Sequence, residues 1–592
     1  MATQRVTFLR EATGLVREYG LSTAFVITFN QTVGAGVYAF SVQQIHSWPG
    51  SVPWLGMLIA TVPVTAVTLV YAWLAVAMPR TGGDYLYMTR ILHPFVGWIV
   101  TWLILGTRFL VIGTLMFSDV KLWGGALVLG GLQAKSQALL DLGRVLAVND
   151  NVAAWGAVLL TLTVYYFVVV LGKPFLWMVW IVFIVPVVSG VATIILFALN
   201  PFNPSSLQAV WDALYGVGAY QEIVSLATQG GWRLTPPNLD ATIGALGVAI
   251  FALGLAPFTT AIFGSEIKNP RTTFRLVMPG SAIITGIYMA ILSASPHWAA
   301  GTEFMSQYDF VYYTAQLRQQ LKINPGLEPT IPVFGLAFAP GFLLGPLVIL
   351  GAALSLYHVV PSLALSYPRY FVAMAFDRML PAWLADVSER FHTPVKAISM
   401  LVLGGILAIA LRIFFSWTVG LVAFAIVVPL LWAVMGLVGI VLPYRMPRIY
   451  EVVRYSVGSA TGHVVAYVVM ALLGFLLGII MFGVANTVAW VLVGLLSYPV
   501  AYAITLIASR ISRQEMGRVP VVVLLGLVAL VFSGYFTIDQ FMRATRTVAG
   551  RQSITMTLIT LAVGIVVYAY YYWKNKREGV DLKYVYSEIP PE

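Results

Sequence analysis

Long apolar segments recur along the chain, and short polar or basic segments separate them. A helix needs roughly 20 apolar residues to cross the hydrocarbon core of a bilayer, where every backbone N–H and C=O must find its partner inside the segment. The pattern predicts an all-α integral membrane protein with about 14 transmembrane helices. The predicted spans are residues 20–46, 53–78, 95–120, 152–171, 175–199, 241–265, 277–297, 334–366, 395–415, 418–442, 463–484, 487–508, 519–537 and 554–573.

The composition agrees with a bilayer environment, because 59% of the 592 residues are hydrophobic and only 10% are charged. The chain has no cysteine, which excludes disulfides, zinc–thiolate sites and cysteine nucleophiles. The six histidines fall in no ligand spacing, and no two acidic residues share a predicted span. Neither a metal nor another cofactor is therefore predicted, and an enzyme is not indicated.

The net charge of +11 would suggest nucleic acid as a partner of a soluble protein. Here the basic residues lie mostly in short loops on one predicted side, which is the positive-inside pattern of membrane proteins, so a nucleic-acid partner is not predicted. Residues 1–19 and 574–592 are then cytoplasmic tails of a multi-pass protein of the cell membrane. Arg543, Arg546 and Arg551 form one basic cluster on the opposite side.

Two predicted outer connections, residues 200–240 and 300–331, are long and mixed in polarity. Either they fold as short helices that cap an outer vestibule, or they are simple loops.

Two predicted spans are interrupted near their middle. The first carries Asn30, Gln31 and Thr32 followed by Gly34 and Gly36, and a Gly-x-Gly step weakens a helix. If this segment unwinds, its freed amides can donate hydrogen bonds to a carboxylate.

The sixth predicted span contains Gly254 and Pro257, which again interrupt a helix at mid-depth. It lies five spans after the first. Two broken spans at corresponding positions of two five-span halves indicate an inverted repeat with the binding site at its interface. The alternative is that each glycine only allows close helix packing, which is common in membranes.

Four polar segments follow predicted spans in order and resemble the amino acid-polyamine-organocation permeases. They are residues 79–87 (PRTGGDYLY), 265–271 (SEIKNPR), 369–381 (RYFVAMAFDRMLP) and 442–447 (LPYRMP). The resemblance implies a leucine-transporter-type fold, in which five-plus-five inverted spans surround a substrate at broken helices 1 and 6. It implies a ten-helix core at residues 20–445, with repeats at 20–199 and 241–442, and four additional helices at residues 446–573.

The family pattern, carried over by position, places the substrate at the two breaks. Backbone groups for a substrate carboxylate are expected from Val33, Gly34, Ala35 and Gly36. Contacts with the ammonium and the side-chain pocket are expected from Phe251, Gly254, Leu255, Ala256 and Phe258. The family often has an acid where this chain has Ala256, Pro257 and Phe258, so a cationic substrate is not favoured. At the cytoplasmic gate, Glu266 is expected to pair with Arg80 or Arg271.

Three further residues are candidates for coupling or charge recognition. Arg108 lies deep in the third predicted span, where an unpaired guanidinium is expensive. It can bind an acidic substrate group, replace a coupling cation, or hydrogen-bond to broken-helix carbonyls. His358 and Ser362 lie in the eighth span, where the histidine is either a proton-coupling group or a packing residue. The eighth span lacks the paired hydroxyl residues of sodium-coupled relatives, so proton coupling, exchange or facilitated diffusion is favoured over sodium coupling.

The sequence as a whole predicts a secondary transporter that moves an amino acid or a related amine-containing solute by alternating access. Two alternatives are a transport-inactive sensor of the same fold and a permease for another solute such as a nucleobase or a polyamine. A channel is not indicated, because no span repeats a ring-forming filter motif. The oligomeric state is left open.

Overall fold

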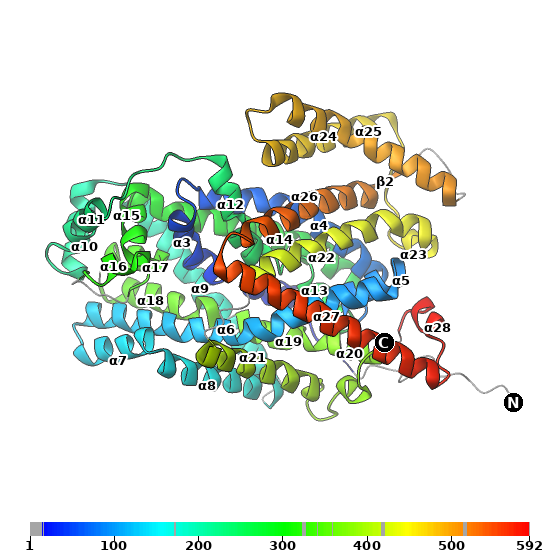
Figure 1. Cartoon of the computed structure of the whole chain (residues 1–592), viewed down its shortest axis with the longest axis horizontal. Coiled ribbons are helices and arrows are strands. Elements are labelled where there is room, and N and C mark those ends of the chain that lie inside the picture. The colour runs from blue at the N-terminus through cyan, green and yellow to red at the C-terminus, as the bar shows by residue number, and fades with distance from the viewer. Residues whose placement is uncertain are drawn as a thin grey trace.

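A computed structural model describes residue 15 and residues 17–170, 173–321, 327–339, 341–357, 359–415, 421–512 and 518–590. The chain forms a bundle in which most long helices run along the longest axis of the molecule (Figure 1). The helices up to residue 262 are α1 (Leu21–Thr32), α2 (Ala35–Tyr38), α3 (Phe40–Ser47), α4 (Pro53–Ala77), α5 (Gly83–Ile91), α6 (Pro94–Ala134), α7 (Gln137–Val148), α8 (Asp150–Val169), α9 (Lys173–Leu199), α10 (Pro204–Tyr215), α11 (Ala219–Gln229), α12 (Leu239–Leu253) and α13 (Thr259–Ile262).

The remaining elements complete the bundle and add one small sheet. They are η1 (Gly264–Glu266), α14 (Pro270–Ala299), α15 (Thr302–Tyr313), α16 (Ala315–Arg318), α17 (Ile331–Ala337), α18 (Gly341–Tyr357), α19 (Val359–Ser366), α20 (Pro368–Phe376), η2 (Ala382–Ala385), α21 (Val395–Phe415), α22 (Leu421–Arg445), α23 (Pro447–Glu451), β1 (Ser456–Val457), α24 (Ala460–Phe482), α25 (Thr487–Ser512), β2 (Val519–Pro520), α26 (Val521–Ala544), α27 (Val548–Arg577) and α28 (Leu582–Ser587). Strands β1 and β2 pair antiparallel.

Within the described residues, twelve helical segments are long and apolar enough to cross a membrane. Each coincides with one of the predicted spans. The two predicted spans missing from this set are residues 20–46 and 241–265, and both are divided into shorter helices. These are the two spans in which glycine and proline predict an interruption.

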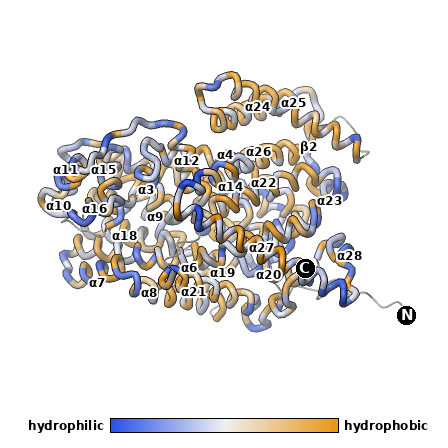
Figure 2. The backbone as a smooth tube through the Cα atoms, in the orientation of Figure 1, coloured by the Kyte–Doolittle hydropathy of each residue, from blue (hydrophilic) through white to orange (hydrophobic). Residues whose placement is uncertain are grey.

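The distribution of hydropathy along the chain is typical of a protein that crosses a bilayer. Apolar residues fill the middle of the bundle, and hydrophilic residues gather towards its two ends (Figure 2). Large apolar side chains also face outward on the long helices, including Leu159 (66% exposed) and Trp177 (75%). Such a surface is stable against lipid tails and unstable against water.

The two ends of the bundle differ. Helices α5, α20, α23 and α28 lie at one end, called the tail end, and α10, α11, α15 and α16 lie at the other, called the cap end (Figure 1). The cap-end helices fall in the two long connections, so these connections fold as short helices rather than as simple loops. Helix α11 packs against α15, so the two connections form one cap.

Helix α6 extends beyond its predicted end at residue 120 to Ala134, and α7 folds back against it. The close packing depends on glycine. A Cβ added at Gly124 would lie 2.5 Å from the amide nitrogen of Ala147, and one at Gly143 would lie 2.7 Å from the carbonyl oxygen of Gly124. The apolar pattern of the sequence does not predict this hairpin.

Helices α24 and α25 form a hairpin that stands apart from the other helices and approaches the bundle at α26 (Figure 1). The interior is formed by helices such as α4, α14 and α22, whose largest buried side chains include Tyr71 and Trp432. Helices α22 and α26 cross closely at Gly436 and Gly526, where each added Cβ would lie 2.6 Å from the other residue's carbonyl oxygen.

The glycine crossing of α22 and α26 predicts a specific stability defect. We expect Gly526→Ala to lower the free energy of unfolding by about 1–3 kcal/mol, because the methyl group forces the two backbones apart. Gly534→Ala, on the same helix with open space around it, is the matched control and should gain up to about 1 kcal/mol from helix propensity. Thermal unfolding in detergent measures both variants, and equal melting temperatures would contradict the packing argument.

Candidate functional site

The first break separates α1 from α2 at Val33 and Gly34. The amide of Val33 still donates to the carbonyl oxygen of Phe29 at 2.8 Å, and Val33 itself has extended backbone angles (φ −89°, ψ 117°). The chain then starts a new helix at Ala35. The first amides of any helix have no carbonyl partner within it, so Ala35 and Gly36 present N–H groups beside the bend.

The second break separates α12 from α13 over residues 254–258. Pro257 has no amide hydrogen, so the carbonyl oxygen of Leu253 accepts its hydrogen bond from the amide of Ala256 instead, at 3.1 Å. Regular bonding resumes when the amide of Thr259 donates to the carbonyl oxygen of Leu255 at 3.2 Å. Residues 254–258 therefore form a turn that interrupts the regular helical pattern of hydrogen bonds.

Polar side chains join the two breaks directly. The hydroxyls of Thr28 and Thr260 are 2.6 Å apart, and the Thr259 hydroxyl donates to Oε1 of Gln31 at 2.9 Å. Helices α1 and α13, more than 200 residues apart in sequence, therefore meet beside the interrupted backbone. The predicted convergence of the two breaks is present in the fold, although the two threonines were not predicted as part of it.

Gln31 extends this connection to the eighth predicted span. Its Nε2 donates to the carbonyl oxygen of Ser362 at 2.7 Å and to the hydroxyl of Ser366 at 2.9 Å. The neighbouring Asn30 donates from Nδ2 to the carbonyl oxygen of Val179 on α9, at 2.9 Å. One buried amide side chain thus links α1, α13 and α19. The sequence predicts Gln31 at mid-depth but does not predict this role.

The described side chains at the breaks are closed off from solvent. Val33, Leu255, Ala256 and Phe258 are at most 3% exposed, and Gly34, Gly36 and Gly254 are also buried. The side chains of Ala35 and Phe251, and the whole of His358, lie outside the described residues.

Two polar atoms beside the breaks have no hydrogen-bond partner in the described part of the chain. They are Oδ1 of Asn30 and the hydroxyl oxygen of Ser362. Buried polar atoms are normally paired, because an unpaired one costs about 1–3 kcal/mol. Unused hydrogen-bonding capacity next to two interrupted helices is suited to a polar solute.

Aromatic rings lie on the tail-end side of the second break. The Phe258 ring centroid is 6.4 Å from that of Tyr71 and 6.5 Å from that of Tyr367. The Tyr71 hydroxyl in turn donates to Oδ2 of Asp84 at 3.0 Å. A buried carboxylate therefore lies one aromatic layer away from the second break.

Arg108 is 1% exposed and close to the second break. Its guanidinium carbon lies 3.7 Å from the ring centroid of Phe424 and 5.1 Å from that of Tyr367. Phe424 also packs at Gly254, where an added Cβ would be 3.2 Å from its Cε1 atom. Nε and Nη2 of Arg108 make no hydrogen bond within the described residues. Aromatic faces therefore hold this cation, and these two nitrogens do not bond to broken-helix carbonyls.

Glu266 has a different partner from the predicted ones. Its two carboxylate oxygens accept from Nε and Nη2 of Arg369 at 2.9 and 2.8 Å, and both side chains are buried. Arg80 instead donates to the carbonyl oxygen of Pro590 at 2.9 Å, and Arg271 is exposed. The prediction of Arg80 or Arg271 as partner rests on proximity in sequence, whereas α20 brings Arg369 against η1 in the fold and its planar fork matches the carboxylate.

Further contacts close the tail end around this pair. The amide of Tyr19 donates to the carbonyl oxygen of Glu266 at 3.0 Å, which ties the segment before α1 to η1. A second buried pair joins Arg90 on α5 to Asp377 after α20, with distances of 2.5 and 2.7 Å. Arg90 also donates to the carbonyl oxygen of Glu588, so the segment after α28 lies against α5.

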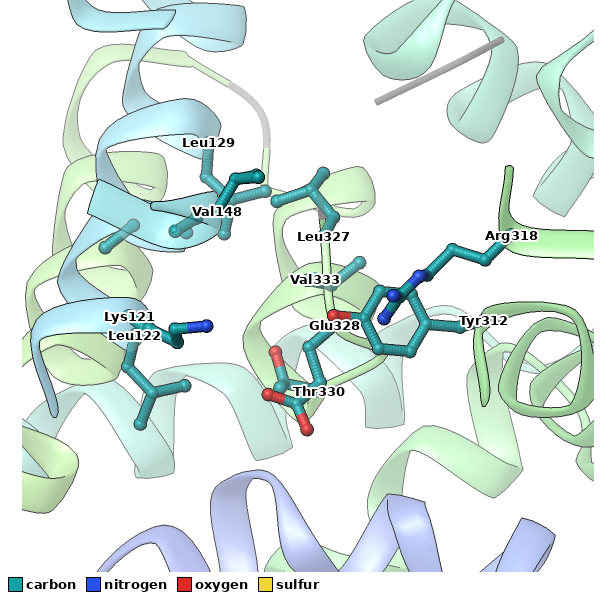
Figure 3. A pocket seen from close by; sticks show the side chains of 13 residues that line it. Lys121, Leu122, Leu129, Val148, Tyr312, Arg318, Leu327, Glu328, Thr330 and Val333 are labelled. Atoms are coloured by element: carbon teal, nitrogen blue, oxygen red, sulfur yellow. The ribbon is translucent and has the colours of Figure 1, made fainter. Parts of the chain in front are cut away.

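A separate pocket of about 230 Å³ lies at the cap end. Lys121 and Arg318 approach it from opposite walls, with Glu328 between them (Figure 3). Glu328 accepts a hydrogen bond from the Tyr313 hydroxyl at 2.5 Å, and burial raises the pKa of its carboxyl. Apolar residues form the rest of the lining, among them Leu122, Leu129, Val148, Leu327 and Val333.

No group of three or more histidine, aspartate or glutamate side chains suited to a metal ion occurs in the described part of the chain. The chemistry available at the breaks is hydrogen bonding by peptide groups and by neutral side chains.

Comparison with known proteins agrees with this geometry. A family model described as amino acid permease matches residues 19–567. An uncharacterised transporter of Mycobacterium tuberculosis is 26% identical over 406 residues, which are 67% of this chain and 73% of the relative. The serine/threonine exchanger SteT of Bacillus subtilis is 23% identical over 402 residues, which are 66% and 75% of the two chains.

A shorter match links the chain to Asc-type amino acid transporter 1 of Homo sapiens, with 33% identity over 118 residues, 19% of this chain and 22% of the relative. The resemblance in the four polar segments is thereby confirmed at the level of the family. Because the family model extends over nearly all of the sequence, the chain belongs to the amino acid permease family, within the amino acid-polyamine-organocation superfamily.

Proposed function

We propose that the chain is a secondary transporter that moves a neutral amino acid across the membrane by alternating access, with the solute bound at the two breaks. The observation that carries this proposal is the meeting of two interrupted helices, joined by Thr28 to Thr260 and by Gln31 to Thr259. Broken helices that meet near the middle of a membrane are the usual solute sites of such transporters. The names of two relatives, a serine/threonine exchanger and an amino acid transporter, support the same solute class.

In this proposal each break recognises one end of the amino acid. The amides at Val33 to Gly36 donate to the carboxylate, and the carbonyls at Phe251 and at Gly254 to Ala256 accept from the ammonium. Phe258 closes the side-chain pocket. The described residues at this position, Ala256, Pro257 and Phe258, carry no acid, which favours a neutral side chain over a cationic one.

The proposed layout has fourteen spans, which are the twelve long apolar segments of the described residues and the two broken segments. Residues 20–199 and 241–442 form the two inverted repeats, and residues 446–573 add four helices outside the core. We assign the tail end to the cytoplasm and the membrane to the cell membrane, because the basic loops predicted to be inside gather at that end.

Counterflow in proteoliposomes tests the proposal. Vesicles loaded with one amino acid should take up the same labelled amino acid, and a panel of neutral and cationic amino acids, polyamines and nucleobases identifies the solute class. We expect neutral amino acids to exchange. Binding without flux would instead identify a sensor, and exchange of nucleobases or polyamines alone would assign a different solute.

The site at the first break predicts that Gly36→Leu abolishes binding. The leucine side chain fills the space beside the bend that the solute carboxylate needs, so affinity should fall by about a hundredfold or more. Gly280→Leu, at a helical glycine with open space around it, is the matched control and should bind normally. Equilibrium binding of labelled L-alanine measures both variants, and unchanged affinity of the Gly36 variant would rule out this placement of the site.

The buried ion pair of Glu266 and Arg369 is expected to stabilise the closed state of the tail end. Glu266→Gln leaves Arg369 buried without its counter-charge, which costs about 3–5 kcal/mol in the closed state, so the tail end should open. The natural absence of cysteine lets a single Ala261→Cys substitution on α13 report opening by thiol labelling. Labelling should increase severalfold in the Glu266 variant.

The control for this experiment is Lys396→Gln, which removes the exposed pair of Lys396 and Asp386 (2.6 Å) worth about 0–1 kcal/mol. Its labelling should match that of the parent. If the Glu266 variant is labelled no faster than this control, the buried pair does not hold the tail end closed.

A further inference from the structure

Asp84 is a buried carboxyl group that the proposed solute site does not use. It is 1% exposed at the start of α5, in a segment outside the membrane-spanning helices. The Tyr71 hydroxyl donates to Oδ2 at 3.0 Å, and the amide of Tyr85 donates to Oδ1 at 3.1 Å. Burial raises the pKa of the Asp84 carboxyl to about 6, and these hydrogen bonds offset only part of the increase.

The residues around Asp84 are bonded to the helix after the second break. The amide of Gly82 donates to the carbonyl oxygen of Ile262 at 3.1 Å, and Thr81 forms a backbone bridge with Phe263. A Cβ added at Gly83 would lie 2.8 Å from the carbonyl carbon and oxygen of Ala261. Movement of α13 away from the start of α5 must therefore break these contacts.

Asp84 is also close to the solute site. Its hydrogen-bond donor Tyr71 has its ring 6.4 Å from that of Phe258, and the Phe258 ring is 6.5 Å from that of Tyr367. Only this aromatic layer separates the carboxyl group from the second break. A change of charge at Asp84 is thus linked both to α13 and to the wall of the site.

The groups that face Asp84 are mostly neutral. From α4 the neighbour is Tyr71, and from α20 it is Tyr370, whose hydroxyl is close to the carboxyl group. Tyr87 on α5 and Tyr367 before α20 are further tyrosines in the same cluster. The cation Arg108 on α6 lies beyond Tyr367 and Tyr370. In this neighbourhood the ionised carboxylate has hydrogen-bond donors but no ion-pair partner within the described residues.

We propose that Asp84 carries the proton coupled to amino acid transport, an inference that rests on the proposed function. In the closed arrangement the proton resides on the carboxyl group, which removes a buried negative charge beneath the second break. When α13 and the start of α5 separate at the tail end, water reaches the carboxyl group, its O–H bond breaks, and the proton leaves to the cytoplasm. Solute and proton then favour the same closed arrangement, which is the energetic requirement for cotransport.

The direction of the pH effect follows from this linkage. The proton is held more tightly in the closed arrangement than in the hydrated open one, so low pH favours the closed state. As pH rises through about 6 the carboxyl group ionises and this preference is lost. Opening of the tail end should therefore increase as pH rises from about 4, near the ordinary carboxyl pKa, to about 6, and level off above that.

Two transport assays on Asp84→Asn test the proposal, because asparagine keeps the size of the side chain and still accepts the Tyr71 hydrogen bond. In the parent protein, an inward proton gradient should drive L-alanine accumulation. The accompanying proton entry should lower the pH of the vesicle lumen, which a trapped pH-sensitive dye reports. In the variant, L-alanine counterflow should persist, while gradient-driven accumulation should fall by about tenfold or more. Asp141→Asn, on the exposed face of α7, is the matched control and should behave as the parent does.

The outcomes separate the two proposals. Absence of counterflow for every neutral amino acid of the panel in the parent protein would overturn the proposed function, and with it this inference. Counterflow in the parent together with equal gradient-driven uptake in parent and Asp84 variant would overturn the inference alone.

A second measurement does not depend on flux. The labelling rate of Ala261→Cys is divided at each pH by the rate of the unfolded protein, which removes the pH dependence of the thiolate itself. This ratio should rise with pH when Asp84 is present and become independent of pH in the Asp84→Asn background. The same pH dependence in both backgrounds would also overturn the proposal, even if the variant transports poorly.

Discussion

The structure depends on one constraint, which is that peptide groups inside a membrane must have hydrogen-bond partners. Two helices give up part of their regular bonding near mid-length, and side chains next to the breaks link these helices to each other. Gln31 is the centre of this network, because it contacts Thr259 and Ser366 by hydrogen bonds to their hydroxyls and Ser362 through its carbonyl oxygen. The breaks are therefore held in place by a polar network, and they keep hydrogen-bonding capacity available for a solute.

Buried charges are arranged around these breaks in two different ways. At the tail end, Glu266 with Arg369 and Arg90 with Asp377 are pairs whose hydrogen bonds satisfy both partners. Such an ion pair contributes little to stability, but removing one partner leaves the other charge buried and unpaired. Such pairs are therefore suited to holding an end that opens in one cooperative step. Nearer the breaks, Asp84 and Arg108 are surrounded by aromatic residues instead. Within the described residues, neither of these two side chains has an ion-pair partner.

The sequence predicts the elements well and their contacts less well. The apolar periodicity locates the spans, and Gly34, Gly36, Gly254 and Pro257 locate both interruptions, because these residues act on their own backbone. The partner of Glu266 is predicted wrongly, because Arg369 is 103 residues away and only the fold brings it close. The hairpin of α6 and α7 is missed for the same reason, since glycine packing requires knowledge of the facing helix. Asp84 is present in the sequence motif, but nothing in its local sequence shows that it is buried beside Tyr71.

The central claim is that bare peptide groups at the two breaks bind the charged ends of an amino acid. Competition against bound L-alanine by its methyl ester and by its N-acetyl derivative tests this claim most directly, because each compound removes one charge and keeps the side chain. Losing one charge-assisted hydrogen bond costs about 1.5–3 kcal/mol, so each derivative should compete about tenfold or more weakly than L-alanine itself. Equal competition by either derivative would show that the corresponding break does not bind that end of the solute.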